Sequence, residues 1–351
     1  MAKKNTKRVM MNIVLFIAIF LLTIYGVFNG EDLGEIKKDV LGCNYIWLIP
    51  TIICIFIFIW CESVIIWFLM RSYGIKIKKR ECFLYSSVGF FFNSVTPSAT
   101  GGQPMQIYFM KKKKIPIPIS TVILMIVTII YKLVLVVIGL GILIFARGFV
   151  AHYMEDVLAI FYIGLLINII CITVLMILVF HQTLAQKMAV LFLKLLEKLH
   201  LLKKRRNRIN KLVDSMDLYR ETAAYIRQHM GRMALIFVFT FFQRCMLFSV
   251  TWFVYKAFGL SGTSFVSVIT LQAVISIAAD MLPFPGGMGI SESLFLKLFL
   301  PVFGEALLLP GLVLSRGIGY YCQLIISGIF TMIATVTMLF KKKSIYRKID
   351  F

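Results

Sequence analysis

The segment Met281–Phe295, "MLPFPGGMGISESLF", places two prolines and three glycines in an otherwise apolar part of the chain. Proline removes a helical hydrogen bond and glycine is a poor helix former, so an unbroken helix is not expected here. A helix that only crosses a bilayer would avoid such a break, because unsatisfied backbone groups are costly in hydrocarbon. The break therefore indicates a special role, either in packing or in function.

The composition around this segment indicates a membrane protein. Of 351 residues, 60% are hydrophobic and 15% are charged, whereas soluble domains are about half apolar and about a quarter charged. The apolar residues form long runs, and about 20 of them suffice to cross a bilayer as a helix. The sequence predicts an all-α polytopic membrane protein with a single integral membrane domain, 1–351. No cleaved signal peptide is expected, because no small-residue cleavage site follows the first run.

The strong positive charge fits the same class. The net charge is +22, from 38 Lys and Arg against 16 Asp and Glu. Basic residues flank the apolar runs, as the positive-inside rule requires, and would contact an anionic membrane surface. The run "KKRRNR", 203–208, has no interleaved aromatic residues, so a lipid surface is favoured over nucleic acid as its partner. No phosphate-binding loop, metal motif or CxxC pair occurs, so no cofactor is expected.

The order of apolar runs and basic flanks predicts the topology. Both termini are expected in the cytoplasm and the chain in the plasma membrane, with 181–232 as a basic cytoplasmic loop. The predicted spans are 9–28, 45–70, 116–146, 158–180, 233–255 and 312–340.

Two shorter segments between these spans predict hairpins. Both flanks of 83–110 are basic, and 28 residues cannot cross twice, so we expect a re-entrant hairpin broken at "TPSATGG", Thr96–Gly102. Residues 264–303 must leave and return to the external face, with Met281–Phe295 at their centre. The fold class is thus an inverted repeat of spans with two Gly/Pro-broken re-entrant hairpins.

The two halves, 9–146 and 158–340, repeat one order of spans and breaks with opposite starting sides. Matching broken helices in an inverted repeat indicate the substrate site of a transporter, and the freed N–H groups would suit a phosphate or carboxylate. We expect both breaks to line a shared polar chamber; tight glycine packing is the alternative. The candidate substrate-binding residues are Asn93, Thr96, Pro97, Gly101, Gly102, Gln103, Lys132, Arg244, Pro283, Pro285, Gly286, Gly287, Gly289, Glu292 and Arg316.

Ionisable residues inside apolar runs support such a site, because each is costly in the bilayer unless it faces a partner or a cavity. Lys132, Arg244 and Arg316 lie too far from the ends of their spans to reach the surface. Glu62 and Glu292 are their expected counter-ions, although the pairing cannot be assigned from the sequence. Structural ion pairs that hold the helices together are the alternative. Asp280 and Lys297 complete the set.

The sequences of both breaks resemble motifs of the lysylphosphatidylglycerol synthase transmembrane family, the flippase-like domain of multiple peptide resistance factor proteins. Asn93 with "TPSATGGQPMQIYF" is similar to the first motif and "PFPGGMGISES" to the second, and Arg316 with Tyr320 and Tyr321 also looks familial. The resemblance covers about residues 9 to 340. It departs from the longer relatives, which add a cytoplasmic aminoacyltransferase domain, and Gln103 stands where many relatives have an acid.

The resemblance implies a flippase-like transporter that moves phosphatidylglycerol or lysyl-phosphatidylglycerol between leaflets, linked to resistance to cationic peptides. One alternative is a lysyl-tRNA-dependent phosphatidylglycerol lysyltransferase, or an accessory subunit of a separate aminoacyl-lipid synthase. Another is a transporter of a different anionic lipid or a small solute. Catalytic residues are not expected in this chain alone, and the sequence leaves homodimer formation open.

Overall fold

A computed structural model of the chain describes residues 33–96, 99–146, 148–149, 153–181, 183–188, 190–191, 207–280, 282, 287 and 289–346. These residues form helices and contain no strand. The predicted all-α architecture is therefore confirmed. The predicted first span, 9–28, lies outside the described residues.

Five helical segments are long and apolar enough to cross a membrane, and four agree closely with predicted spans. The fifth combines the second hairpin's returning arm with the last predicted span. They are Tyr45–Ser72, Ile117–Phe145, Leu158–Phe180, Gly231–Ala257 and Ile290–Thr337.

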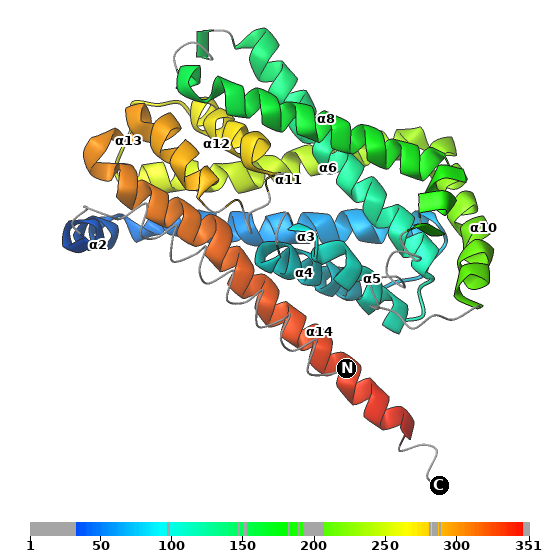
Figure 1. Cartoon of the computed structure of the whole chain (residues 1–351). Helices are drawn as coiled ribbons and strands as arrows, with labels where there is room; N and C mark the ends of the chain where they lie inside the picture. Colours follow the sequence, from blue (N-terminus) through cyan, green and yellow to red (C-terminus); the bar gives the residue numbers. More distant parts are fainter. Residues whose placement is uncertain are drawn as a thin grey trace.

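The helices run in the following order (Figure 1). They are α2 (Leu33–Gly42), the 3-10 turn η1 (Tyr45–Trp47), α3 (Leu48–Ser72), α4 (Lys79–Val95), α5 (Gly102–Lys112), α6 (Ile117–Phe145), the 3-10 turn η3 (Glu155–Val157), α8 (Leu158–Phe180), α10 (Asn207–Gln228), α11 (Met230–Ala257), α12 (Phe265–Ala279), α13 (Ile290–Arg316), the π-helix η5 (Gly317–Cys322) and α14 (Gln323–Tyr346).

Helices α3 and α11 form an antiparallel pair along the length of the molecule (Figure 1). At one end, the backbone N–H of Asn44 donates to the carbonyl of Ala257 over 2.8 Å. At the other end, the Tyr225 hydroxyl, near the end of α10, donates to the carbonyl of Ser72 over 2.5 Å. The pair therefore defines two opposite ends of the bundle.

The first hairpin, α4 and α5, opens at the end where α3 finishes. Helix α4 starts there, and the ammonium of Lys113, just after α5, contacts the Glu81 carboxylate of α4 at 2.5 Å. The tip of the hairpin lies deeper, since Phe90 packs on Phe58 in the middle of α3 at 4.8 Å between ring centroids.

The second hairpin opens at the opposite end. Helix α13 is interrupted at Gly304, with φ 70° and ψ 167°, so residues 290–303 form the arm that returns from the break. The ring of Phe265 at the start of α12 packs on Trp252, and Phe303 packs on Tyr255, with centroids 5.5 and 5.7 Å apart. Both arms thus reach the end of α11.

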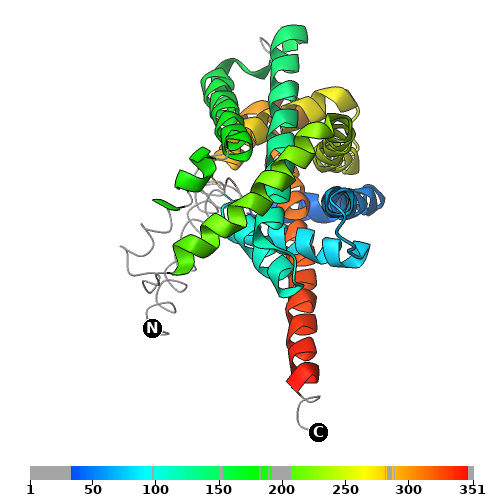
Figure 2. The same cartoon turned by 90° about the vertical axis from the view of Figure 1, so that its right-hand side faces the viewer.

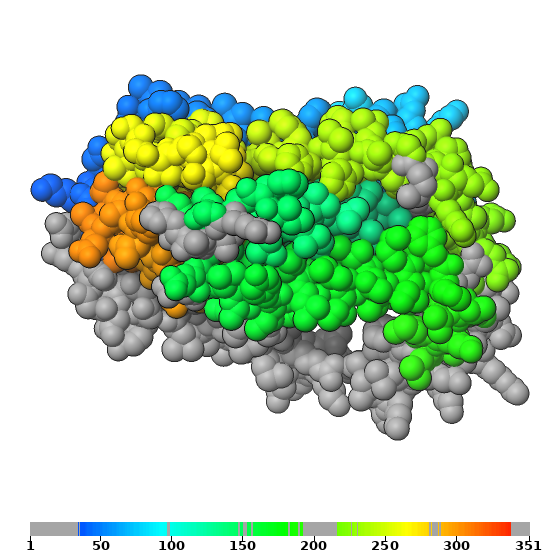
Figure 3. Space-filling view, turned by 90° about the horizontal axis from the view of Figure 1, so that it is seen from above, coloured from blue at the N-terminus to red at the C-terminus, as the bar shows by residue number. Residues whose placement is uncertain are grey.

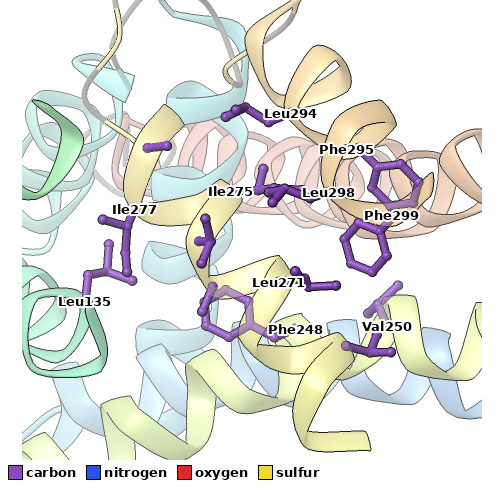
Figure 4. Packing of buried hydrophobic residues seen from close by; sticks show 14 of the residues in the cluster. Leu135, Phe248, Val250, Leu271, Ile275, Ile277, Leu294, Phe295, Leu298 and Phe299 are labelled. Carbon is purple, nitrogen blue, oxygen red and sulfur yellow. The ribbon is translucent and has the colours of Figure 1, made fainter. Parts of the chain in front are cut away.

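One of two apolar clusters has its centre between α12, α11 and α13 (Figure 4), and the other lies between α3, α4, α6 and α10. Leu271 and Ile275 of α12 lie between Phe248 of α11 and the rings of Phe295 and Phe299 on α13, which stack at 4.4 Å. Lipid is as apolar as these side chains, so close packing rather than exclusion of water stabilises this core.

The C-terminal part of the last helix extends beyond the bundle. The first part of α14 packs on α4, where the rings of Phe330 and Phe83 lie 4.8 Å apart, and the helix then projects away from the other described helices (Figures 1 and 2). Helix α8, on the face shown in Figure 3, is also peripheral, and Ile163, Leu166 and Ile170 are each more than half exposed. Exposed apolar side chains of this kind suit contact with lipid tails.

Opposite entry of the two hairpins is the arrangement that the predicted inverted repeat requires. The repeat itself, and the depth of each hairpin in a bilayer, stay predictions.

Candidate functional site

The first break is closed by neutral side chains of its own hairpin. The N–H of Gly101 donates to the Thr96 hydroxyl and the N–H of Gly102 donates to the Asn93 side-chain oxygen, each over 2.9 Å. These two acceptors cap the start of α5, as polar side chains commonly do at helix N-termini. Pro97 lies outside the described residues.

Glycine at position 102 allows the two arms to meet. A Cβ atom there would lie 2.6 Å from the carbonyl oxygen of Gly89 on α4 and would also overlap the Asn93 amide. Real Cβ atoms do not approach a carbonyl this closely. The packing interpretation of the glycines therefore applies to Gly102, alongside any role in binding.

The second break is closed by a carboxylate. Gly287 and Gly289 have φ of 67° and 85°, a left-handed region that favours glycine. The N–H of Gly289 donates to Oε2 of Glu292 over 2.7 Å, and the Ser291 hydroxyl donates to the carbonyl of Gly287 over 2.6 Å. Pro283, Pro285 and Gly286 lie outside the described residues.

These contacts correct one expectation from the sequence. The N–H groups of Gly101, Gly102 and Gly289 were expected to be free for an anion, and instead each donates to a side chain of the same hairpin. The reason is that a backbone donor without a partner is costly where water is scarce. An anion could reach these donors only by displacing their present acceptors.

The buried charges form ion pairs. The guanidinium Nε of Arg316 lies 2.8 Å from the Glu292 carboxylate, so this expected counter-ion is correct. Lys132 pairs with Asp280, at the end of α12, at 2.5 Å. The partner of Lys132 is therefore neither of the two glutamates named from the sequence. Asn168 of α8 lies 3.3 Å from the same ammonium.

Arg244 completes the buried cluster from α11. Its guanidinium interacts electrostatically with Glu62 of α3, which also accepts from the Gln106 amide of α5 over 3.4 Å. The guanidinium carbon lies 3.8 Å from the centroid of the Tyr131 ring, a cation–π contact. The Nε atom of Arg244 is buried and has no hydrogen-bond partner among the described residues.

The two breaks meet at the middle of α6. The side-chain amide of Gln103, at the first break, donates to the Thr128 hydroxyl. Lys132, which holds Asp280 at the second break, lies four residues further along, about 6 Å along the helix axis. Segments that are far apart in the chain thus contact one helix within about one turn.

A second connection runs through the π-helix η5. The Arg316 guanidinium, held by Glu292, lies 5.1 Å from the centroid of the Tyr320 ring. The Tyr320 hydroxyl donates over 2.8 Å to the carbonyl of Ser94, at the end of α4. The π-helical widening is a feature often found at functional sites. It places Arg316 and Tyr320 between the two breaks.

Most of the chain matches a known protein family. The family model described as the lysylphosphatidylglycerol synthase TM region matches residues 10–327. The chain belongs to this family. A search of curated proteins found no match to the chain. The family assignment and the apolar helices together establish a multi-pass membrane protein with a lipid-related function.

Several members of the polar cluster in this family member were not among the candidates from the sequence. Asn168 is the clearest example, because it is fully buried and interrupts the apolar run of α8; a lone amide in such a run is the signal that could have found it. Gln106 and Tyr131 resemble ordinary residues of amphipathic helices and carry no such signal. Lys297, in contrast, is exposed and lies outside the cluster.

The shared polar chamber expected from the sequence is not seen among the described residues. Two cavities lined by described residues lie elsewhere, one beside Tyr73, Tyr225 and Arg232, the other beside Thr183 and Lys187. Between the breaks, the described polar side chains form ion pairs and hydrogen bonds with one another.

Proposed function

We propose that this chain moves phospholipid between the two leaflets of the membrane. The observation that carries the proposal is the convergence of both helix breaks on the buried ion pairs at the middle of α6. Charged side chains inside a membrane are costly and commonly mark the pathway of a substrate or an ion. The family assignment adds the link to lipid.

The physical problem of such a reaction is the polar headgroup, which must cross about 30 Å of hydrocarbon. Lys132, Arg244 and Arg316 would donate to the phosphate, and Asp280, Glu62 and Glu292 would accept from an ammonium group. The bound headgroup would exchange its water for these side chains when the ion pairs separate. Helix breaks at both sides of the cluster supply places where the arms can move.

The family name suggests phosphatidylglycerol and lysyl-phosphatidylglycerol as the first lipids to test, the latter in connection with cationic peptide resistance. Outward movement of a lipid with net positive charge opposes an inside-negative potential, at about 2.3 kcal/mol per charge per 100 mV. Export of that lipid would need a gradient or coupling to its synthesis.

The test is translocation of acyl-labelled phospholipids in liposomes that contain the purified protein. Glu292→Gln and Arg316→Ala should slow translocation by at least about tenfold, because each leaves a buried group without its partner. Lys297→Gln, which removes an exposed charge of α13, is the matched control. Normal rates in both site variants, at equal protein level, would contradict the site, and no lipid movement by the wild type would contradict the function.

Lysyl transfer from tRNA to phosphatidylglycerol is the second candidate, because the family's description contains the word synthase. A transferase needs a surface for charged tRNA and an acid–base pair, and the buried groups described above are engaged with one another. Incubation of the purified chain with lysyl-tRNA and phosphatidylglycerol decides between the two. Formation of lysyl-lipid by this chain alone would favour the transferase; formation only with a separate synthase would favour an accessory role.

The same proposal includes a plasma-membrane location with both termini in the cytoplasm. It is supported by the basic residues at the end of the bundle where the first hairpin opens, including Arg71, Lys79 and Lys113. Single cysteines at Lys114 and Gly262, in a background without the native cysteines, should react with an impermeant reagent from the inside and the outside respectively. The reverse pattern would overturn the orientation.

A further inference from the structure

Three pairs of oppositely charged side chains lie near the two breaks. Lys132 lies 2.5 Å from Asp280, and Arg316 lies 2.8 Å from Glu292. Lys132, Arg244 and Glu292 are buried, and their partners are partly buried. The third pair, Arg244 with Glu62, interacts electrostatically. Their formal charges sum to zero.

Because positive and negative side chains are equal in number, only certain ligands can replace the ion-pair partners. Removal of one member of a buried ion pair leaves the other uncompensated in a medium of low dielectric constant. A phosphate alone would satisfy Lys132 and leave Asp280 without a cation. An ammonium alone would do the reverse. A headgroup that carries one phosphate and one ammonium supplies a partner to both sides of a pair at once.

The cations are also placed to share one anion. Arg244 and Lys132 interact electrostatically, and both lie over the ring of Tyr131, at 3.8 and 5.1 Å from its centroid. Lys132 is 5% exposed and Arg244 9% exposed. The Nε of Arg244 is a buried donor with no hydrogen-bond partner among the described residues, so an acceptor between the two cations would satisfy a group that the protein leaves open.

We infer that the substrate of this site is a zwitterionic phospholipid, whose headgroup joins a phosphodiester to a single ammonium, as in phosphatidylethanolamine. The inference rests on the proposed function and narrows it from the charged lipids suggested by the family name. The phosphodiester lies between Lys132 and Arg244, and the ammonium lies against Asp280 and Glu62. Such a lipid carries no net charge, so its movement between leaflets does no work against the membrane potential.

The test measures three acyl-labelled lipids in liposomes containing the full chain: phosphatidylethanolamine, phosphatidylglycerol and lysyl-phosphatidylglycerol. Phosphatidylethanolamine should move at least about tenfold faster than either charged lipid, and its rate should not change under a potassium diffusion potential. Faster movement of a charged lipid overturns the inference and leaves the proposed function standing. Movement of no lipid above the level of protein-free liposomes overturns both.

Charge-changing variants test whether the balance of charge in the cluster sets the lipid preference, because each protein is compared by the ratio of its rates for two lipids. Asp280→Asn gives the cluster one excess positive charge and should lower the ratio of phosphatidylethanolamine to phosphatidylglycerol rates by about tenfold. Glu305→Gln makes the same change of net charge at an exposed site of α13 and should leave the ratio unaltered. Lys132→Met should shift preference toward lysyl-phosphatidylglycerol instead. A ratio that is the same in all four proteins contradicts the inference, because general destabilisation would lower all rates together.

Discussion

Both helix breaks leave backbone N–H groups that need an acceptor, and the two breaks supply that acceptor with different side chains. At the first, the backbone donors of Gly101 and Gly102 are satisfied by a hydroxyl and an amide that lie within nine residues along the chain. At the second, the donor of Gly289 is satisfied by the Glu292 carboxylate, which must itself be neutralised by Arg316, 24 residues away. The first break is neutral and local, and the second is charged and dependent on tertiary contacts.

This difference indicates what each helix break requires in order to open. A neutral cap can open and close within its own hairpin without leaving a charge behind. The charged break can open only if several helices move together or if a substrate supplies the missing partners. The second break is therefore the better candidate for a step coupled to substrate, whereas the first can open without one.

The largest effect on stability should come from removal of the ion pair at the second break. Arg316→Ala leaves the Glu292 carboxylate, 7% exposed, without its cation and should lower the free energy of unfolding by about 3–5 kcal/mol. Thermal unfolding in detergent measures the change, with Lys297→Ala as the control on the same helix. If both variants unfold at the same temperature, the ion pair does not stabilise the second break.

The next effect tests close packing at the first break. Gly102→Ala brings a Cβ atom within 2.6 Å of the Gly89 carbonyl oxygen and should destabilise the protein by about 1–3 kcal/mol. Gly141→Ala, in α6, is the matched control, because a Cβ there meets nothing within 4 Å and a helical alanine should be neutral or stabilising. Equal stability of the two variants would show that the arms of the first hairpin do not touch as described.

A smaller effect is expected for the neutral cap itself. Asn93→Ala removes the acceptor of the Gly102 N–H and should cost about 1 kcal/mol, the usual value for a helix cap. Thr121→Ala removes a hydroxyl that donates to the Ile117 carbonyl of the same helix and should stay within about 0.5 kcal/mol of wild type. A loss as large as that of Arg316→Ala would erase the distinction between the two breaks.

An effect of similar size should come from the link between the breaks. Tyr320→Phe removes the hydrogen bond to the Ser94 carbonyl and should cost about 0.5–1.5 kcal/mol, with Tyr108→Phe, at an exposed ring, as the control. In liposomes, Tyr320→Phe should alter lipid translocation by a larger factor than Tyr108→Phe does. Unchanged translocation in both would mean that the link is structural only.

The positions of the breaks could be predicted from local sequence because proline and glycine act on the backbone where they stand. The pairing of Arg316 with Glu292 was also accessible in part, since both residues were recognised as buried charges of opposite sign. For Lys132 the sequence predicted a carboxylate partner without assigning the pair, and the residue found there is Asp280 rather than Glu62 or Glu292. Its carboxylate, Asp280, stands at the end of a helix next to the break, where the sequence offers nothing to distinguish a cap, a loop residue and an ion-pair partner.

The sequence by itself determined the class of this protein: helical, multi-pass and broken at two places, because the length of an apolar run and the backbone limits of proline and glycine are local properties. Only the tertiary structure decided which polar groups meet. Lys132 and Asp280 are 148 residues apart in the chain, and Ser94 and Tyr320 are 226 apart. Contacts across such separations depend on how the helices pack. From the sequence alone, any buried carboxylate could pair with any buried cation, and only the packing decides which of them meet.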